Sequence, residues 1–323
     1  MIEKAAIVLF WMVMCVGLVG CNAQATEPVL KKPWIIDPHT HFKGADQVKL
    51  ESQKRTFHPR STLGKVVVPE DYRAIANRLG IQATVVVEAV DQENPEFNDW
   101  VLKQADSDLI CGYIARGDLT SPQFAANHAR YSATGFLRGY RFRLDELQGY
   151  LENKVARSNL KVLEKQEMVI DLLVDHSHWP SVMTLAREFP GLTVVLDHCL
   201  RARVKNGQVP QEWEKAVEEC GKYANVNCKL SSLLNFADVT PFTEQAPTDL
   251  KFYRPILQTC FDAFGEDRVV FATNWAVCTH YGSVDDVVRL VSEFLQEQGE
   301  PALRKGMREN AIRVFKIRNK DLR

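Results

Sequence analysis

The chain has 323 residues, and its 40 basic side chains nearly balance 41 acidic ones, so the formal net charge is -1. A hydrophobic share of 46% is that of an ordinary globular protein and excludes disordered, collagen-like and multi-span membrane proteins. The balanced charge, without a long run of lysine or arginine, excludes the extended basic surface typical of nucleic-acid binding. No nucleic-acid partner is therefore expected.

The N-terminus has the features of an export signal. Lys4 is the only basic side chain before an apolar run over residues 5–20. This run has the length of the hydrophobic region of a signal peptide and is shorter than the ~20 residues of a comfortable membrane span. It ends in LVGC, which resembles a bacterial lipobox and predicts a signal peptide over residues 1–20, with lipid attached to Cys21. An uncleaved membrane anchor is the alternative. Both predict an exported chain tethered at the periplasmic or outer surface of a bacterial membrane.

Cysteine usage does not predict a disulfide framework. Eight cysteines occur; Cys15 leaves with the signal peptide and Cys21 carries the lipid. The other six are scattered without C-x-x-C spacing, and several lie in or beside apolar strand-like runs, as small buried thiols do. We expect free buried thiols, with a Cys220–Cys260 disulfide as the alternative.

After a lipidated cysteine and linker over residues 21–32, residues 33–323 follow a strand–helix cadence. Eight short apolar runs rich in β-branched residues recur, several of them hydrophobic on both faces as buried parallel strands are. The cadence predicts an α/β fold, a single (β/α)8 TIM barrel without a second domain. The predicted strands lie within 34–42, 81–90, 109–119, 136–144, 168–178, 192–199, 225–233 and 268–277.

Capping residues mark several of the intervening helices. Pro69 with two acidic residues predicts a helix start and Gly80 its end, while Ser283 with Asp286 opens another helix that Gly299 closes. Ser121-Pro122 opens a further one, which Gly135 follows.

Two long connections, residues 43–67 and 234–250, follow the first and seventh strands. Long loops after barrel strands lie at the catalytic face, so both are candidate lids; solvated loops without a role are the alternative.

The first strand ends with two histidines. His39 and His41 are two residues apart on a strand, so both side chains point to the same side and can address one metal ion or one carbonyl oxygen. The carboxyl ends of barrel strands carry the catalytic residues, so this pair predicts an active site.

Other strand ends add polar residues. The sixth strand ends in Asp197-His198, and the fifth is followed by His176 and His178, of which we favour His178 as a site residue and the other as a helix cap. Arg138 and Arg141 on the fourth strand and Lys229 on the seventh are candidates for holding a carboxylate or a polarised carbonyl.

Not every buried charge needs to contact a substrate. One of Arg138, Arg141 and Arg143 is expected to face a helix and form an ordinary salt bridge. Glu88 on the second strand is a candidate substrate-binding residue, but it could equally pair with Arg116 on the third.

Eight motifs together resemble the amidohydrolase-related branch of the amidohydrolase superfamily. The resemblance is strongest to sugar-lactone hydrolases of the fuconolactonase and rhamnonolactonase type and to 2-pyrone-4,6-dicarboxylate lactonase. It runs from Pro33 to Phe315 in the order IIDPHTHF, VVVEAVDQ, GDLTSP, LRGYRFRL, DLLVDHSHWP, FPGLTVVLDHCL, NVNCKLSSL and FGEDRVVFATNWAVC.

The resemblance implies hydrolysis of a cyclic ester. His39, His41 and His198 would surround the substrate carbonyl or a divalent metal, and arginines such as Arg141 would hold carboxylate or hydroxyl groups. Such proteins carry a water-activating carboxylate in a G-S-D-W-P-like motif after the eighth strand. Asn274 stands there in this chain, within T-N-W-A.

An amide cannot replace a carboxylate as a general base, and loss of a base often costs ~10²–10⁴-fold in rate. Three explanations remain open. Asp197, Glu88 or a neutral histidine takes over as base, the substrate supplies its own base, or the site binds a ligand without converting it.

The expected cofactor is either none or one divalent, zinc-like ion. His39, His41 and His198 could hold zinc with one open position, but some lactonases of this branch resemble metal-free enzymes, and Asn274 removes a negative charge from the site.

The leading functional hypothesis is an exported hydrolase that opens a small-molecule lactone. The alternatives are a non-catalytic ligand-binding lipoprotein, and a decarboxylase or C–N hydrolase of the same superfamily.

Overall fold

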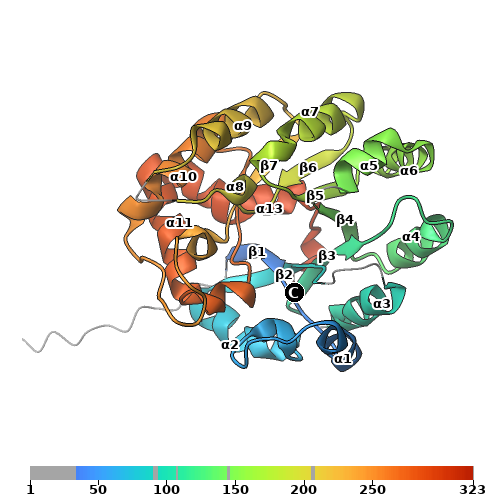
Figure 1. Ribbon diagram of the computed structural model, residues 1–323, viewed down its shortest axis with the longest axis horizontal. Coiled ribbons are helices and arrows are strands. Elements are labelled where there is room, and N and C mark those ends of the chain that lie inside the picture. Colours follow the sequence, from blue (N-terminus) through green and yellow to red (C-terminus); the bar gives the residue numbers. More distant parts are fainter. Residues whose placement is uncertain (1–33, 90–93, 107, 144–145, 205–207, 323) are drawn as a thin grey trace, which may run out of the picture. The chain divides into compact units, whose positions relative to one another are not determined.

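Eight parallel strands form a closed barrel in the computed structural model, which describes residues 34–89, 94–106, 108–143, 146–204 and 208–322. The strands pair in sequence order from β1 to β8. Figure 1 looks into the ring and labels β1 to β7. Their bounds are β1 Ile35–Thr40, β2 Ile81–Val87, β3 Ile110–Arg116, β4 Leu137–Arg143, β5 Val169–Leu173, β6 Thr193–Leu196, β7 Val226–Leu230 and β8 Val269–Phe271. The predicted (β/α)8 barrel is therefore confirmed, and each strand lies inside a predicted apolar run.

The barrel closes between β1 and the residues that follow β8. Thr40 bridges Trp275 in parallel register, and the His41 backbone N–H donates to the Trp275 carbonyl at 2.7 Å. Asp37, buried in β1, accepts hydrogen bonds from Thr273 N at 2.9 Å and Thr273 Oγ1 at 2.6 Å. Asp37 therefore links β1 to the residues that follow β8 and stabilises the closure of the barrel.

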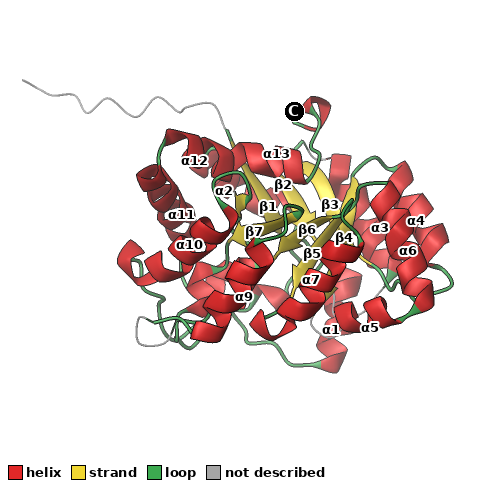
Figure 2. Cartoon of the chain, turned by 90° about the horizontal axis from the view of Figure 1, so that it is seen from above, coloured by secondary structure: helices red, strands yellow, loops and turns green. Residues whose placement is uncertain are grey.

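Helices surround the barrel, as the side view in Figure 2 also shows. They are α1 Ala45–Lys54, α2 Pro69–Leu79, α3 Pro95–Lys103, α4 Phe124–Ala133, α5 Glu146–Glu152, α6 Lys154–Lys165, α7 Trp179–Glu188, α8 His198–Arg201, α9 Gln211–Gly221, α10 Leu250–Phe264, α11 Val284–Gln298, α12 Glu300–Arg304 and α13 Asn310–Val314. The helix α1 lies within the long connection over residues 43–67, which is one of the two candidate lids. Among the described residues, no helix has the length and apolar character needed to cross a membrane.

Most of the predicted capping residues act as expected, but Ser121 and Pro122 precede the start of α4, which begins at Phe124 with Gln123 as its N-cap. Gly80 ends α2 in the left-handed region at φ 70°, where glycine has no Cβ penalty. Ser283 Oγ accepts the backbone N–H of Asp286 at the start of α11, and Gly299 follows its last residue.

Two apolar layers hold the barrel together. Outward-facing strand residues pack against the helices in a large core, and inward-facing residues such as Val85 and Val195 form a second core inside the barrel. Phe315, at the end of α13, closes this inner core at the amino-terminal end of the strands. The floor is therefore apolar, which leaves the carboxyl ends of the strands for polar chemistry.

Arg138 lies at this floor end, not at the catalytic face. Its guanidinium donates to Asp321 Oδ2 at 2.8 Å and to the Cys111 carbonyl at 2.8 Å. This position corrects the expectation that Arg138 contacts the substrate, and it makes Arg138 the strand arginine that forms a structural salt bridge.

All six cysteines of the described residues are free and buried. The expected free thiols are thus confirmed, and Cys220 and Cys260 form no disulfide. Cys15 and Cys21, with the predicted signal peptide and lipidation site, lie outside the described residues.

Replacing Asp321 by alanine should strongly destabilise the fold, because the buried Arg138 guanidinium would lose its carboxylate partner. Loss of one partner of a buried pair typically costs about 3–5 kcal/mol, so we expect the free energy of unfolding in urea to fall by about 3 kcal/mol. The matched control is Asp99→Ala, which removes the half-exposed partner of Arg130 and should cost under about 1 kcal/mol. Equal losses in the two variants would contradict the structural role of Arg138.

Candidate active site

Three histidines meet at the carboxyl ends of the strands. His39 lies in β1, His41 follows it, and His198 follows β6. The His39 ring lies 4.8 Å from the His41 ring and 4.5 Å from the His198 ring, measured between centroids. These three residues, called the histidine cluster below, were predicted from sequence, and the structure brings them together.

Asn274 completes this arrangement as the sequence placed it. Its side-chain oxygen lies 3.1 Å from His41 Nε2, and His41 Nε2 lies 3.2 Å from His39 Nε2. The Asn274 amide nitrogen donates to Ser232 Oγ at 2.8 Å. Asn274 and Ser232 both have positive φ values, 58° and 57°, in which asparagine is better tolerated than most residues.

A buried charge network lies directly below the histidine cluster. Lys229 Nζ donates to Asp197 Oδ1 at 3.0 Å and to Asp171 Oδ2, and Arg141 donates to Asp197 Oδ2 at 2.7 Å. Lys229, Asp171 and Asp197 are completely buried, and Arg141 is 4% exposed. The network, defined as these four residues, is electrostatically close to balanced, which such deep burial of charge requires.

Lys229 acts on a histidine instead of on the substrate. Its ammonium lies 3.0 Å from His39 Nδ1 and has no exposed surface. This position corrects the expectation that Lys229 binds the substrate directly. Arg141 is likewise tied to Asp197 beneath the cluster, so its predicted role in holding substrate is not supported by its contacts.

Glu88 pairs with an arginine of β4 and not with Arg116. Arg143 donates to both oxygens of Glu88, at 2.8 and 3.1 Å, whereas Arg116 pairs with Glu146. Glu88 is buried, but the Arg143 side chain is 22% exposed. Arg143 is therefore the cation of β4 that reaches the barrel mouth. Its position at the end of the strand was the available signal for this role.

An unusual backbone segment places His198. Residues His198–Arg201, labelled α8, have φ values of 50–57° and form a left-handed turn. Left-handed backbone costs about 1–3 kcal/mol at a non-glycine residue and persists where surrounding contacts impose it. Here the His198 Nδ1 lies 2.8 Å from Ser231 Oγ, and Trp213 Nε1 donates to the Cys199 carbonyl at 2.8 Å. Sequence reasoning had no signal for this turn, because none of the four residues is glycine.

The electrostatics of the site keep the histidines neutral. Burial lowers the pKa of His41 and of His198 to about 3, and burial together with Lys229 holds the pKa of His39 well below its usual range. Burial alone would raise the pKa of Asp197, but Lys229, His39 and Arg141 hold it well below its usual range. Asp197 is therefore a permanent carboxylate and His41 and His198 are neutral ligands or bases.

Two proton arrangements satisfy this geometry. His41 Nδ1 lies 2.9 Å from the Val87 carbonyl, so its proton sits on Nδ1 and its Nε2 carries a lone pair. If His39 donates from Nδ1 to Asp197 Oδ1, 3.2 Å away, the Nε2 of His39 is also a lone pair. If Lys229 instead donates to His39 Nδ1, the proton sits on His39 Nε2 and bonds to His41.

The first arrangement fits a cation. His39 Nε2, His41 Nε2 and Asn274 Oδ1 are then all acceptors, with neighbouring atoms 3.1–3.2 Å apart. Ligands bound to one ion at about 2.0–2.2 Å stand about 3.3–3.6 Å apart around a tetrahedral centre, so only a small expansion is needed. In the second arrangement the amide of Asn274 is turned over so that its nitrogen donates to His41, an exchange that heavy-atom positions alone do not distinguish.

His178 lies after β5, directly before α7, and its side chain is held locally. Its Nδ1 lies 2.9 Å from Asp175 Oδ1 and 3.1 Å from Ser177 Oγ. His178 occupies the N-cap position of α7 without a side-chain capping hydrogen bond, and its predicted role at the substrate stays a prediction.

The two connections considered as lids clasp each other. His58 stacks on Phe242 with ring centroids 4.3 Å apart, and Arg60 donates to the Phe242 carbonyl. His280, after β8, accepts the Thr62 backbone N–H at 3.0 Å and lies 2.8 Å from Thr62 Oγ1. Segments that follow β1, β7 and β8 thus form one wall beside the mouth.

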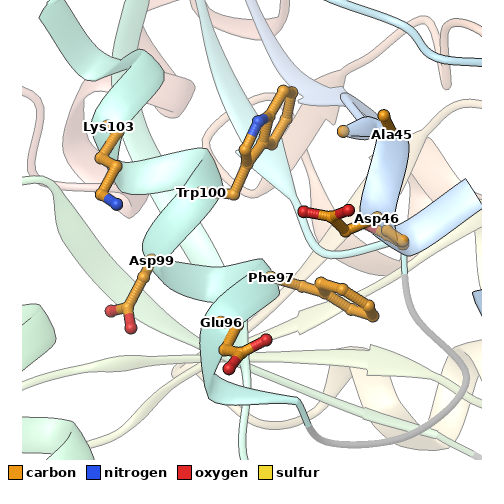
Figure 3. A pocket seen from close by; sticks show the side chains of 9 residues that line it. Ala45, Asp46, Glu96, Phe97, Asp99, Trp100 and Lys103 are labelled. Carbon is orange, nitrogen blue, oxygen red and sulfur yellow. The ribbon is translucent and has the colours of Figure 1, made fainter.

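A separate surface pocket of about 410 Å³ lies between α1 and α3. In Figure 3, Trp100 and Phe97 of α3 point toward Ala45 and Asp46 of α1. Trp100 packs so closely on Gly44 that a Cβ there would stand 2.8 Å from the ring. No residue of the histidine cluster or the buried charge network lines this pocket, so we place the active site at the cluster.

Comparisons with known proteins identify the family of the chain. An amidohydrolase family profile matches residues 36–317. The chain is 26% identical over 258 residues to an L-fucono-1,5-lactonase of Burkholderia ambifaria, covering 78% of this chain and 83% of that protein. It is 24% identical over 283 residues to an L-fucono-1,5-lactonase of Burkholderia multivorans, covering 84% and 92%.

The fold is similar to that of an amidohydrolase of Burkholderia multivorans crystallised with bound zinc. The TM-score is 0.77 at 24% identity, over 88% of this chain and all of that one.

The clasp between Thr62 and His280 should weaken in acid. Burial, with His58 and Lys65, lowers the pKa of His280 to about 4, below its ordinary 6.5. The neutral ring is the form that accepts from Thr62, so the stability it contributes is present above about pH 6.5 and is lost as the pH falls toward 4. We expect hydrogen exchange in residues 56–65 to speed up across that range, and a His280→Gln variant to lose most of this pH dependence. An unchanged pH dependence in the variant would contradict this assignment.

Proposed function

The chain belongs to the amidohydrolase family, as its motifs predicted, and from that premise we propose that it hydrolyses a lactone at the histidine cluster. The observation that carries the proposal is the convergence of His39, His41 and His198 above a buried charge network at the carboxyl ends of the barrel strands. Water adds to the ring carbonyl carbon, the ring C–O bond breaks, and the product is an open hydroxy acid.

The relatives favour a sugar lactone among cyclic esters. The two Burkholderia proteins named above are L-fucono-1,5-lactonases, and both align along most of this chain. Arg143, partly exposed and fixed by Glu88, supplies a guanidinium that can donate to ring hydroxyl groups or to a carboxylate. A polyhydroxylated or carboxylated ring is therefore the substrate class.

One divalent ion fits the acceptor atoms of the site. His39 Nε2, His41 Nε2 and Asn274 Oδ1 would hold it, with the His198 ring beside them, and Asp197 would orient His39 through Nδ1. When bound, such an ion polarises a carbonyl oxygen as a Lewis acid. The zinc-containing structural relative supports this choice of ion.

Water activation falls to a neutral histidine. Asn274 cannot accept the proton, and Asp197 is saturated by Lys229, Arg141 and His39, which keep its pKa low. His198 fixes its Nδ1 on Ser231 Oγ, which leaves Nε2 as the nitrogen that can receive a proton from water. We therefore assign His198 as the general base, acting with a weak basicity because burial, together with Arg141 and Lys229, lowers its pKa.

We also propose that the chain is exported and tethered to a membrane through a lipid on Cys21. The lipobox-like LVGC supports this assignment. Lactone opening would then take place outside the cytoplasm.

The full chain should acidify a weakly buffered solution when a panel of sugar lactones is added, because each ring opening releases a proton at neutral pH. Treatment with a chelator should lower the initial rate at least about tenfold, and added Zn²⁺ should restore it. Saturable binding of the lactones by calorimetry without any acidification would instead support a binding protein. Full activity in the chelated protein would contradict the metal assignment alone.

Substitutions should separate His198 from Asn274. His198→Gln should lower kcat/KM about 10²–10⁴-fold through loss of the base, whereas Asn274→Asp should raise it by adding a carboxylate beside His41. The matched control is His128→Gln, which removes a buried histidine that lies against Tyr140 and Gln166 on the outer side of β4. A rate in His198→Gln equal to that of the control would overturn the base assignment.

A further inference from the structure

Three cysteines converge directly behind the active site. Cys199 lies in the left-handed turn after β6, Cys228 in β7 and Cys260 in α10, and their sulfur atoms all lie within 4.8 Å of one another. All three side chains are completely buried. They come from three elements separated by about thirty residues each, so their meeting is a product of the fold and not of a local motif.

The cluster has the spacing of a thiolate site. Three sulfur atoms bound to one ion at about 2.3 Å stand about 4 Å apart in a trigonal plane, so only a small contraction is needed. Within the part of the chain that the structure describes, no fourth histidine, cysteine or carboxylate joins this group. Structural zinc sites almost always have four ligands, whereas a soft monovalent ion accepts three sulfur ligands.

We propose that Cys199, Cys228 and Cys260 form a binding site for Cu(I). The three-sulfur set and its apolar surroundings suit an ion of low charge, because a buried centre with a large net charge is costly. Binding displaces one thiol proton, so that one thiolate and two thiols around Cu(I) give a centre without net charge. No electron is transferred.

The site shares its backbone with the active site. Cys199 follows His198 directly, and the Cys199 thiol donates to the carbonyl of Lys229 at 3.4 Å. The side chain of Lys229 points to the opposite side of β7, into the buried charge network. Loss of Cu(I) is therefore expected to alter catalysis only through the backbone, and binding is best measured by itself.

The test uses the full chain with Cys15→Ser and Cys21→Ser in every sample. Cu(I) is supplied anaerobically to the reduced protein against a chromophoric Cu(I) chelator, once to the folded chain and once during refolding from urea, because the thiols are buried. We expect one copper per chain and a thiolate-to-copper absorption band. Cys228→Ala and Cys260→Ala should each weaken copper retention at least about tenfold.

The matched control is Cys111→Ala. Cys111 is equally buried and also donates to a backbone carbonyl, that of Thr84 at 3.3 Å, but it does not belong to the cluster. The Cys111→Ala variant should retain copper as well as the parent chain does. Equal retention in Cys228→Ala and Cys111→Ala, or no copper in the reduced parent under both loading conditions, would overturn the proposal. Circular dichroism of each variant separates loss of binding from loss of fold.

Discussion

The ammonium of Lys229 is the charge on which the active site depends. It lies without solvent contact between Asp171 and Asp197 and beside His39. A cation in the middle of the barrel thus compensates two carboxyl groups, of which Asp197 contacts the ring of the first histidine. Unpaired, any of these charges would be costly to bury. Together with Arg141 they hold Asp197 as a carboxylate, and that carboxylate can fix the His39 proton on Nδ1. The chemistry at the mouth is thus set by groups that a substrate does not touch.

Much of this arrangement follows from the sequence. The alternation of apolar runs with capped helices predicts the barrel, and the pair His39 and His41 predicts the end of the barrel at which the site lies. The roles of the strand cations were harder to predict. Arg138 and Arg141 are three residues apart on β4, yet one pairs with Asp321 at the floor and the other with Asp197 below the cluster. Secondary-structure propensity and hydrophobic periodicity identify the strand, but they do not indicate which residue each charged side chain in that strand pairs with.

The backbone around His198 is the other feature without a sequence signal. Four residues in left-handed conformation, none of them glycine, run against local preference. They are held by tertiary contacts such as the hydrogen bond from Trp213 to the Cys199 carbonyl. A backbone conformation that depends on tertiary packing cannot be predicted from the local sequence. This turn directs His198 to the mouth and Cys199 to the outer core. Asn274 has a positive φ of its own, and in the function proposed above it would offer an oxygen to the ion and leave water activation to a histidine.

The most direct test of this account is the protonation of His39, measured by the nitrogen-15 chemical shifts of its ring in the full chain. With one equivalent of Zn²⁺, we expect a proton on Nδ1, facing Asp197, and metal-ligand shifts on the Nε2 atoms of both His39 and His41. A proton that stays on His39 Nε2 in the zinc-saturated protein, with Nδ1 accepting from Lys229, would contradict the account.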